Sequence, residues 1–80
     1  MDYDKGKVDD AVLALLHLNI FKDDKGPRTW KGFDWESLNR LHEKGYISNP
    51  KSKLRSVAVT PEGAKKAEET FRRLFVQSTK

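Results

Sequence analysis

Five basic side chains lie in two short segments of the sequence, residues 28–31 and 51–55. Lysine and arginine bind phosphate oxygens, and no acidic residue between Gly45 and Val59 opposes the cations of the second segment. The pattern indicates contacts with the backbone of double-stranded DNA, although surface lysines are usually only solvated charge. These candidates are Arg28, Lys31, Lys51, Lys53 and Arg55.

Two neighbouring polar residues, Asn39 and Arg40, lie in the middle of the chain within a segment of helical spacing. Asparagine pairs with adenine and arginine with guanine through two hydrogen bonds each, so both residue types read base edges in the major groove. The alternative is that they form the polar outer surface of a helix. We favour this alternative, but both residues stay candidates for DNA contact.

Aromatic side chains gather near the middle of the sequence, at Trp30, Phe33, Trp35 and Tyr46. Exposed rings at these positions would form a docking or base-stacking platform. A chain of this size needs large side chains to bury enough apolar area, so we predict that the four rings belong to the core. An exposed Trp30 would favour a binding surface instead.

No residue pattern points to catalysis or to a metal. His17 and His42 are isolated, the chain has no cysteine, and the glycines form no phosphate-binding motif. We therefore predict no catalytic residue, no metal ligand, no cofactor and no small-molecule ligand. The chain is expected to be a binding protein and not an enzyme.

Length and composition predict a single domain spanning residues 1–80. The net charge of +4 is unevenly distributed, because acidic residues prevail over residues 1–24 whereas six basic residues face only Glu62 over residues 44–66. No apolar run approaches the roughly 20 residues of a membrane span. The charged N-terminus and the lack of cysteine favour the cytoplasm.

Hydrophobic spacing predicts the elements that position these residues. Residues 8–21 read as a helix, and residues 22–33 as a loop with a short strand near 28–31. Asp34 caps a second helix whose inward face is Trp35, Leu38, Leu41 and His42, and Gly45 ends it.

The rest of the chain reads as a hairpin followed by a helix. Residues 46–48 and 54–59 form its two strands around a polar turn at 49–53, and Thr60 with Pro61 begins the last helix. The predicted order is helix, helix, strand, strand, helix, in an α+β domain.

Two phrases of this sequence resemble the second half of bacterial winged-helix domains of the MarR-like and PadR-like groups. Residues 38–47 read Leu-Asn-Arg-Leu-His-Glu-Lys-Gly-Tyr-Ile, and residues 57–63 read Val-Ala-Val-Thr-Pro-Glu-Gly. In those groups a helix ending in Gly-Leu-Ile precedes the wing, and Leu-Thr-x-Glu-Gly opens the last helix. The resemblance implies a winged-helix-like fold and a DNA-binding role.

A second resemblance covers nearly the whole chain. The run Trp-Lys-Gly-Phe-Asp-Trp at residues 30–35, together with residues 38–47, is similar to a bacterial family of small proteins classed as a domain of unknown function. This resemblance implies no activity.

The last helix places Ala64, Ala67, Phe71, Leu74 and Phe75 close to a heptad seam. The seam either covers the rest of the domain or meets its own copy in a homodimer, and the sequence leaves both open. The candidate dimer contacts are Phe71, Leu74 and Phe75.

Two hypotheses of function follow. The first is a dimeric, transcription-regulator-like DNA binder that uses the wing and the middle helix. The second is a protein-interaction module on a winged-helix scaffold that does not bind DNA. Residues 22–33 are too short and broken to form another helix, and Asp34 and Glu36 would face phosphates, which argues against reading of DNA; both hypotheses stay open. A further helix beside the wing would favour DNA, and exposed Trp30, Phe33 or Phe75 would favour a protein partner.

Overall fold

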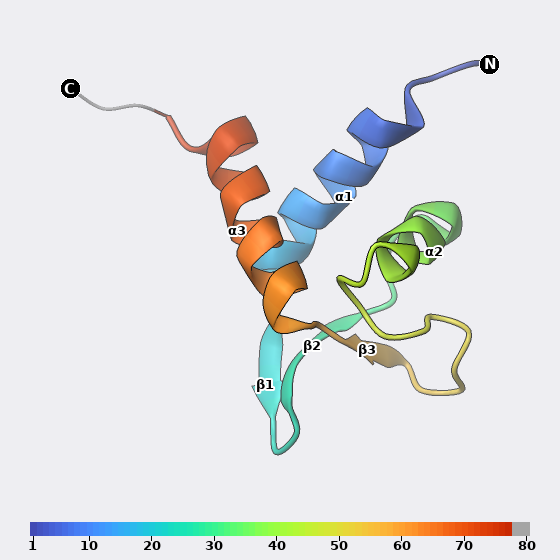
Figure 1. Cartoon of the computed structure of the whole chain (residues 1–80), viewed down its shortest axis with the longest axis vertical. Helices are drawn as coiled ribbons and strands as arrows, with labels where there is room; N and C mark the ends of the chain where they lie inside the picture. Colours follow the sequence, from blue (N-terminus) through green and yellow to red (C-terminus); the bar gives the residue numbers. More distant parts are fainter. Residues whose placement is uncertain (78–80) are drawn as a thin grey trace.

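The computed structural model describes residues 1–77 and has six elements in an α+β arrangement, as predicted (Figure 1). The predicted order was wrong, because a β-hairpin lies between the first two helices. The elements are α1 (Lys5–Leu18), β1 (Phe21–Asp23), β2 (Gly26–Trp30), α2 (Trp35–Glu43), β3 (Ser56–Ala58) and α3 (Pro61–Phe75).

Helix α1 begins and ends earlier than the predicted 8–21. Asp4 caps it by accepting a hydrogen bond from the Lys7 amide (3.0 Å), which satisfies one of the free donors of the first turn. At the other end, the backbone amide of Asn19 donates a hydrogen bond to the Leu16 carbonyl, and its side-chain amide donates to the Leu15 carbonyl. These bonds stop the helix before Phe21, which is then free to enter a strand.

Strands β1 and β2 form a hairpin where the sequence predicted a loop containing one strand. Phe21 pairs with Arg28 and Asp23 with Gly26, and Gly26 has a φ of 113°, a conformation that favours glycine. The strand expected near 28–31 is confirmed in β2, but β1 was missed. Its three residues carry two charges, so no apolar alternation marked it.

Helix α2 is capped as predicted. Asp34 accepts from the Ser37 amide (3.0 Å), and Gly45, with a φ of 81°, follows the last turn. The inward face was predicted partly wrongly, because Ser37, Leu38 and Leu41 are buried whereas Trp35 is 48% exposed. On the first turn of α2 the small side chain of Ser37 faces the core, and Trp35 faces solvent.

The predicted pairing of residues 46–47 with 57–59 is confirmed as a short bridge. Ile47 pairs antiparallel with Val59, and the Ser48 amide donates to the Ala58 carbonyl (2.9 Å). Strand β3 is shorter than the predicted 54–59, and its other edge pairs with β2, which gives the sheet order β1-β2-β3.

The helices pack on one face of this sheet. Alternation along β2 buries Thr29 and turns Arg28 and Trp30 to the opposite face, and β3 likewise buries Val57. The core is continuous from the sheet to all three helices. Its buried apolar side chains are Val12, Leu13, Leu16, Leu38, Leu41, Ile47, Val57, Val59 and Ala67.

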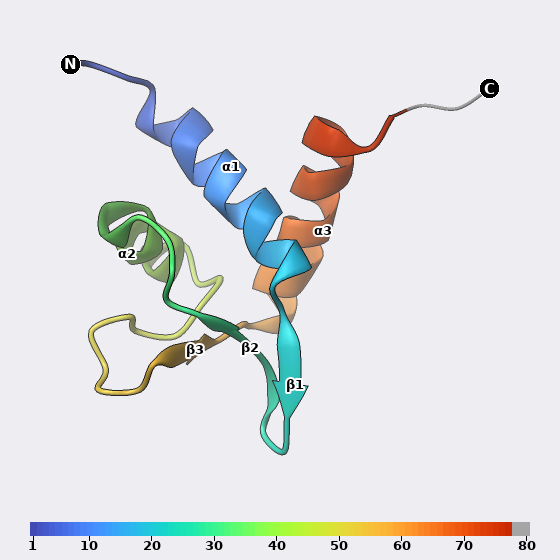
Figure 2. The same ribbon diagram turned by 180° about the vertical axis from the view of Figure 1, so that it is seen from behind.

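Helix α3 begins as predicted, with Thr60 accepting from the Gly63 amide (2.9 Å) and Pro61 in the first turn. It packs antiparallel against α1, and the two helices diverge toward the chain ends in a V (Figures 1 and 2). Ala67 and Thr70 are buried, but Leu74 and Phe75 near the open end of the V are exposed.

Candidate binding surface

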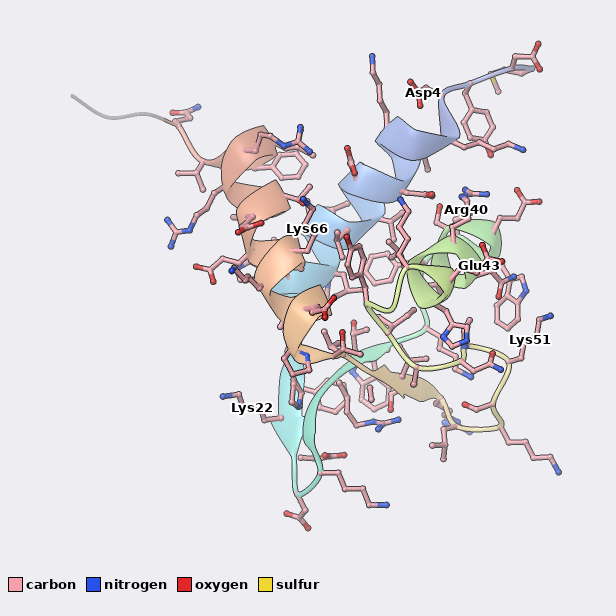
Figure 3. All side chains as sticks on the ribbon, in the orientation of Figure 1. Asp4, Lys22, Arg40, Glu43, Lys51 and Lys66 are labelled. Carbon is pink, nitrogen blue, oxygen red and sulfur yellow. The ribbon has the colours of Figure 1, made fainter. Side chains whose placement is uncertain are left out.

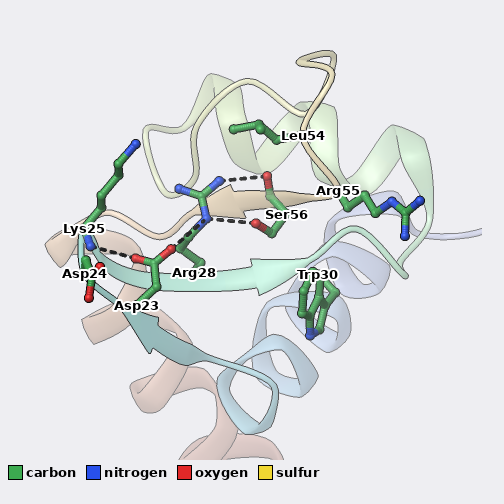
Figure 4. Close-up of a pocket in the computed structure, with 8 residues that line it drawn as sticks. All are labelled: Asp23, Asp24, Lys25, Arg28, Trp30, Leu54, Arg55 and Ser56. Carbon is green, nitrogen blue, oxygen red and sulfur yellow. Dashed lines mark hydrogen bonds and ion pairs between the residues drawn. The ribbon is translucent and has the colours of Figure 1, made fainter.

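A groove of about 440 Å³ runs along the exposed face of the sheet between the β1–β2 turn and the segment before β3 (Figure 4). We call it the Trp30 groove. Strands far apart in the sequence form it, because β2 pairs with β3. Its lining residues are Asp23, Asp24, Lys25, Arg28, Trp30, Leu54, Arg55 and Ser56.

The guanidinium of Arg28 is fixed within the Trp30 groove. Its Nε donates to the Ser56 Oγ (2.8 Å) and its Nη2 to the Ser56 carbonyl (3.0 Å), while Asp23 lies 3.9 Å from Nε. The side chain is only 13% exposed. Among the described residues no acceptor contacts Nη1, so an oriented cation with free donors faces the groove.

Trp30 is 57% exposed, so the prediction that it belongs to the core was wrong. The reason is the strand period: because Thr29 points inward, Trp30 points outward. Its indole stacks on Phe21 of β1, with ring centroids 4.7 Å apart. Phe33 and Tyr46 do pack against the core, as predicted.

Residues 49–55, which we call the basic loop, carry three exposed cations, Lys51, Lys53 and Arg55. Lys31 ties this loop to the end of β2, since its Nζ donates to the Ser52 carbonyl (2.7 Å) and its amide to the Arg55 carbonyl (3.2 Å). The loop therefore has a defined place beside the groove. The five candidates for backbone contact thus lie on one side of the molecule.

The net charge of the chain is concentrated on this side. Residues 23–31 and 51–56 together contain six basic and two acidic side chains. The remaining chain has ten of each, so the formal charge of +4 equals the excess around the groove and the basic loop. Such an excess attracts an anionic partner.

Arg40, a predicted base-reading residue, points instead toward α1. Its Nε and Nη2 donate to the two carboxylate oxygens of Asp9 at 2.6 and 2.9 Å, and Asp9 is 2% exposed. Figure 3 shows Arg40 between α2 and α1, far from Lys51. Because Arg40 is bound to Asp9, α2 presents no free arginine at this position. The neighbouring Asn39 is half-buried.

Burial of the Asp9 carboxyl raises its pKa, but hydrogen bonds from Arg40 and Ser37 and the charges of Arg40 and Lys44 outweigh burial. The net effect is a lowered pKa for Asp9. The hydrogen bond to Asp9 raises the pKa of Arg40 in turn. Both groups are therefore charged at neutral pH, and the pair joins α1 to α2.

The candidate dimer residues lie at the open end of the V. Phe71 is half-buried against His17 (ring centroids 5.2 Å apart), and Phe75 contacts Phe71 (5.6 Å). Leu74 and Phe75 are exposed. On α1, Leu15 and Leu18 are exposed as well, and they were not named as contacts although the sequence of α1 is apolar on more than one side.

Three residues in or beside the groove, Phe21, Leu54 and Ser56, were not predicted from the sequence. Leu54, the only large apolar residue within the basic loop, was a detectable signal. The roles of Phe21 and Ser56 depend on strand register, which local pattern does not fix.

Within residues 1–77, no three side chains of His, Cys, Asp or Glu come together in a group able to hold a metal ion. His42 Nδ1 lies 3.0 Å from the Ile47 carbonyl, and His17 packs on Phe71. No helix of the described chain has the length and apolar character needed to cross a membrane.

Comparison with known proteins supports the second of the two resemblances. The model of a family described as "Domain of unknown function (DUF6429)" matches residues 4–77. The chain belongs to this family. A Sinorhizobium fredii protein named "Uncharacterized protein y4hR" is 48% identical over 77 residues, which cover 96% of this chain and 100% of that protein. No solved structure matches the DUF6429 chain significantly.

Proposed function

We propose that this DUF6429 protein is a non-enzymatic protein-interaction module on a winged-helix-like scaffold that does not read DNA. The order α1, β1, β2, α2, β3 and α3, with the Ile47–Val59 bridge after α2, is compatible with a winged-helix-like scaffold. A β-hairpin, and not a helix, precedes α2. The scaffold therefore lacks one half of a helix-turn-helix.

The chemistry of α2 also disfavours reading of DNA. Asp34 and Glu36 lie at its N-terminal end, where they would repel phosphates, and Arg40 is bound to Asp9. Releasing Arg40 toward a base would leave a buried carboxylate without its partner.

The observation that carries the proposal is the exposure of Trp30 on the sheet face opposite the helices. Trp30 and Phe21 stack there, and the exposed side chain of Leu54 lines the same groove. Exposed aromatic side chains next to a groove are typical anchors of protein interfaces.

In-cell photo-crosslinking tests this function. A benzophenone amino acid is placed at position 30 of the full chain, with position 35 as the matched control because Trp35 is similarly exposed but lies on α2. We expect protein adducts from position 30 and few from position 35. Adducts that nuclease removes, or equal labelling from both positions, would refute the proposal.

A second candidate function rests on the basic loop, because Lys51, Lys53 and Arg55 are exposed with no acidic residue near them in sequence. Three phosphate contacts by these side chains would give log affinity for duplex DNA a slope of about −3 against log salt, at about −0.9 per phosphate. The triple alanine variant would flatten that slope for every duplex sequence. Undetectable binding of the folded protein to duplex DNA at low salt would exclude this candidate.

A further inference from the structure

The Trp30 groove combines an oriented cation with an apolar wall. Ser56 holds the Arg28 guanidinium in place, so little conformational entropy is lost when Nη1 binds an anion. Arg55 adds a second, exposed guanidinium, and Trp30 and Leu54 provide apolar contact area. The groove can thus bind an anionic group and a ring or aliphatic side chain of one ligand together.

The distribution of charge distinguishes between two anionic ligands. Two carboxylates, Asp23 and Asp24, and one cation, Lys25, line the groove at the β1–β2 turn, whereas Arg55 lies at the end of the groove with Trp30 (Figure 4). A nucleic-acid strand carries one phosphate per nucleotide, so a strand along the groove would place phosphates near these carboxylates. A peptide can place its acidic side chains at the arginines alone and a neutral or basic residue at the turn.

We propose that the Trp30 groove binds an extended acidic segment of a partner protein. One or two carboxylates of that segment contact Arg28 and Arg55, and an aromatic or large aliphatic side chain packs on Trp30 and Leu54. This inference rests on the proposed function and adds the chemistry of the partner. Charge complementarity supports an acidic partner, because the excess of four basic side chains over acidic ones lies around this groove and the basic loop.

A titration followed by ¹⁵N nuclear magnetic resonance tests the proposal on the full chain. The probe is the blocked peptide Glu-Glu-Phe-Glu-Glu, compared with Gln-Gln-Phe-Gln-Gln, Glu-Glu-Ala-Glu-Glu and oligothymidylate. The indole N–H signals of Trp30 and Trp35 are internal reporters, since both rings are exposed but only Trp30 lines the groove. We expect the first peptide to shift the Trp30 indole and Arg28 Nε–H signals without moving Trp35.

Two exposed basic residues give matched variants that leave the core intact. Arg55 lines the groove, whereas Lys51 lies in the same basic loop outside it. We expect Arg55→Ala to weaken peptide binding about 5- to 10-fold, the effect of losing a charge-assisted hydrogen bond, and Lys51→Ala to weaken it less than about 2-fold.

Each remaining outcome overturns the proposal. Equal binding of the glutamine peptide would remove the acidic requirement, and tighter binding of oligothymidylate at the same signals would assign the groove to nucleic acid. No shift with any probe at millimolar concentration would also overturn it. Protein crosslinks from position 30 without binding of the glutamate peptide would retain the proposed function and reject only the acidic partner.

Discussion

Gly63 in the first turn of α3 lies directly against the backbone carbonyl of Tyr46, which follows the end of α2. Thr60 reinforces this contact, because its hydroxyl donates to the Gly45 carbonyl (2.7 Å) and accepts from the Gly63 amide (2.9 Å). The Tyr46 carbonyl also accepts from the Thr60 amide (3.0 Å). The two sequence phrases that resemble winged-helix domains therefore meet in space, at the junction of α2 and α3.

Gly63→Ala should destabilise the protein by about 3 kcal/mol, because the new Cβ would overlap backbone atoms of Tyr46, so the backbone of one of the two segments would have to shift. Chemical denaturation of the two proteins measures the difference. Gly32→Ala is the matched control, since a Cβ there meets no atom within 4 Å and should change stability little. Equal effects of the two substitutions would show that the contact with Tyr46 is looser than described.

Asp9→Asn should cost on the order of 2 to 3 kcal/mol, because the amide NH2 of asparagine cannot accept, so Arg40 would lose one of its two hydrogen bonds and the negative charge of its partner. The lowered pKa of Asp9 also predicts a pH dependence. The unfolded chain, whose Asp has a pKa of about 3.9, binds the proton first on acidification. The pair therefore contributes its full stability above that value and loses it as the pH falls toward the lower pKa of the folded state.

Urea denaturation of the wild-type protein and of Asp9→Asn between neutral pH and pH 3 measures how the stability contributed by the Asp9–Arg40 pair depends on pH. The stability difference between them should shrink in acid. A difference that stays constant over this range would mean that the pKa of Asp9 is not lowered by folding.

Thr29→Val should stabilise the protein by about 1 kcal/mol, since a buried hydroxyl without a partner costs free energy that a methyl group does not. Among the described residues, no hydrogen-bond partner contacts the Thr29 Oγ1, and the side chain is fully buried. Thermal unfolding of the two proteins gives the comparison. A lower melting temperature for the variant would reveal a partner for this hydroxyl, such as an ordered water.

Leu41→Ala should destabilise the protein by about 2 to 5 kcal/mol, as expected for loss of a buried leucine, whereas Glu43→Ala should change little. Leu41 is buried in the core and Glu43 is exposed on the same helix. Denaturant midpoints of the two variants measure the contrast. Similar midpoints would place the inward face of α2 elsewhere.

Helix α3 is expected to meet its own copy through Leu74 and Phe75, which are exposed at the open end of the V. Sedimentation at high micromolar concentration should detect a reversible dimer, and Phe75→Asp should return it to a monomer. Phe71→Ala should lower stability as well, because Phe71 also packs on His17 within the chain. A wild-type protein that sediments as a single monomeric species would exclude the dimer under those conditions.

Local sequence signals predicted those parts of the fold that short-range chemistry determines. The caps at Asp34 and Thr60 and the left-handed Gly45 were correct, because each depends only on residues within one helical turn. Strand β1 was missed because its stability comes from pairing with β2 and not from its own apolar pattern.

The candidate site was predicted less completely for the same reason. The cations of the basic loop were identified from composition alone. The ion pair of Arg40 with Asp9 could not be predicted in this way, because the two residues are 31 positions apart and only the packing of α2 on α1 brings them together. Trp30 was assigned to the core because a chain of this size needs large side chains to bury enough apolar area, whereas the register of β2 decides which face it occupies.

The antiparallel packing of α1 on α3 also bears on how the chain folds during synthesis. This packing is the most extensive between any two elements, and it joins the first and last helices of the described chain, with Asp10 paired to Arg73 (3.2 Å). Contacts of such long sequence separation close late, because most of the chain must be ordered before they form. A nascent chain that has not yet released α3 from the ribosome thus exposes the apolar face of α1. Stalling translation within α3 should leave that face available to chaperones, and release of α3 from the ribosome should allow α3 to cover it.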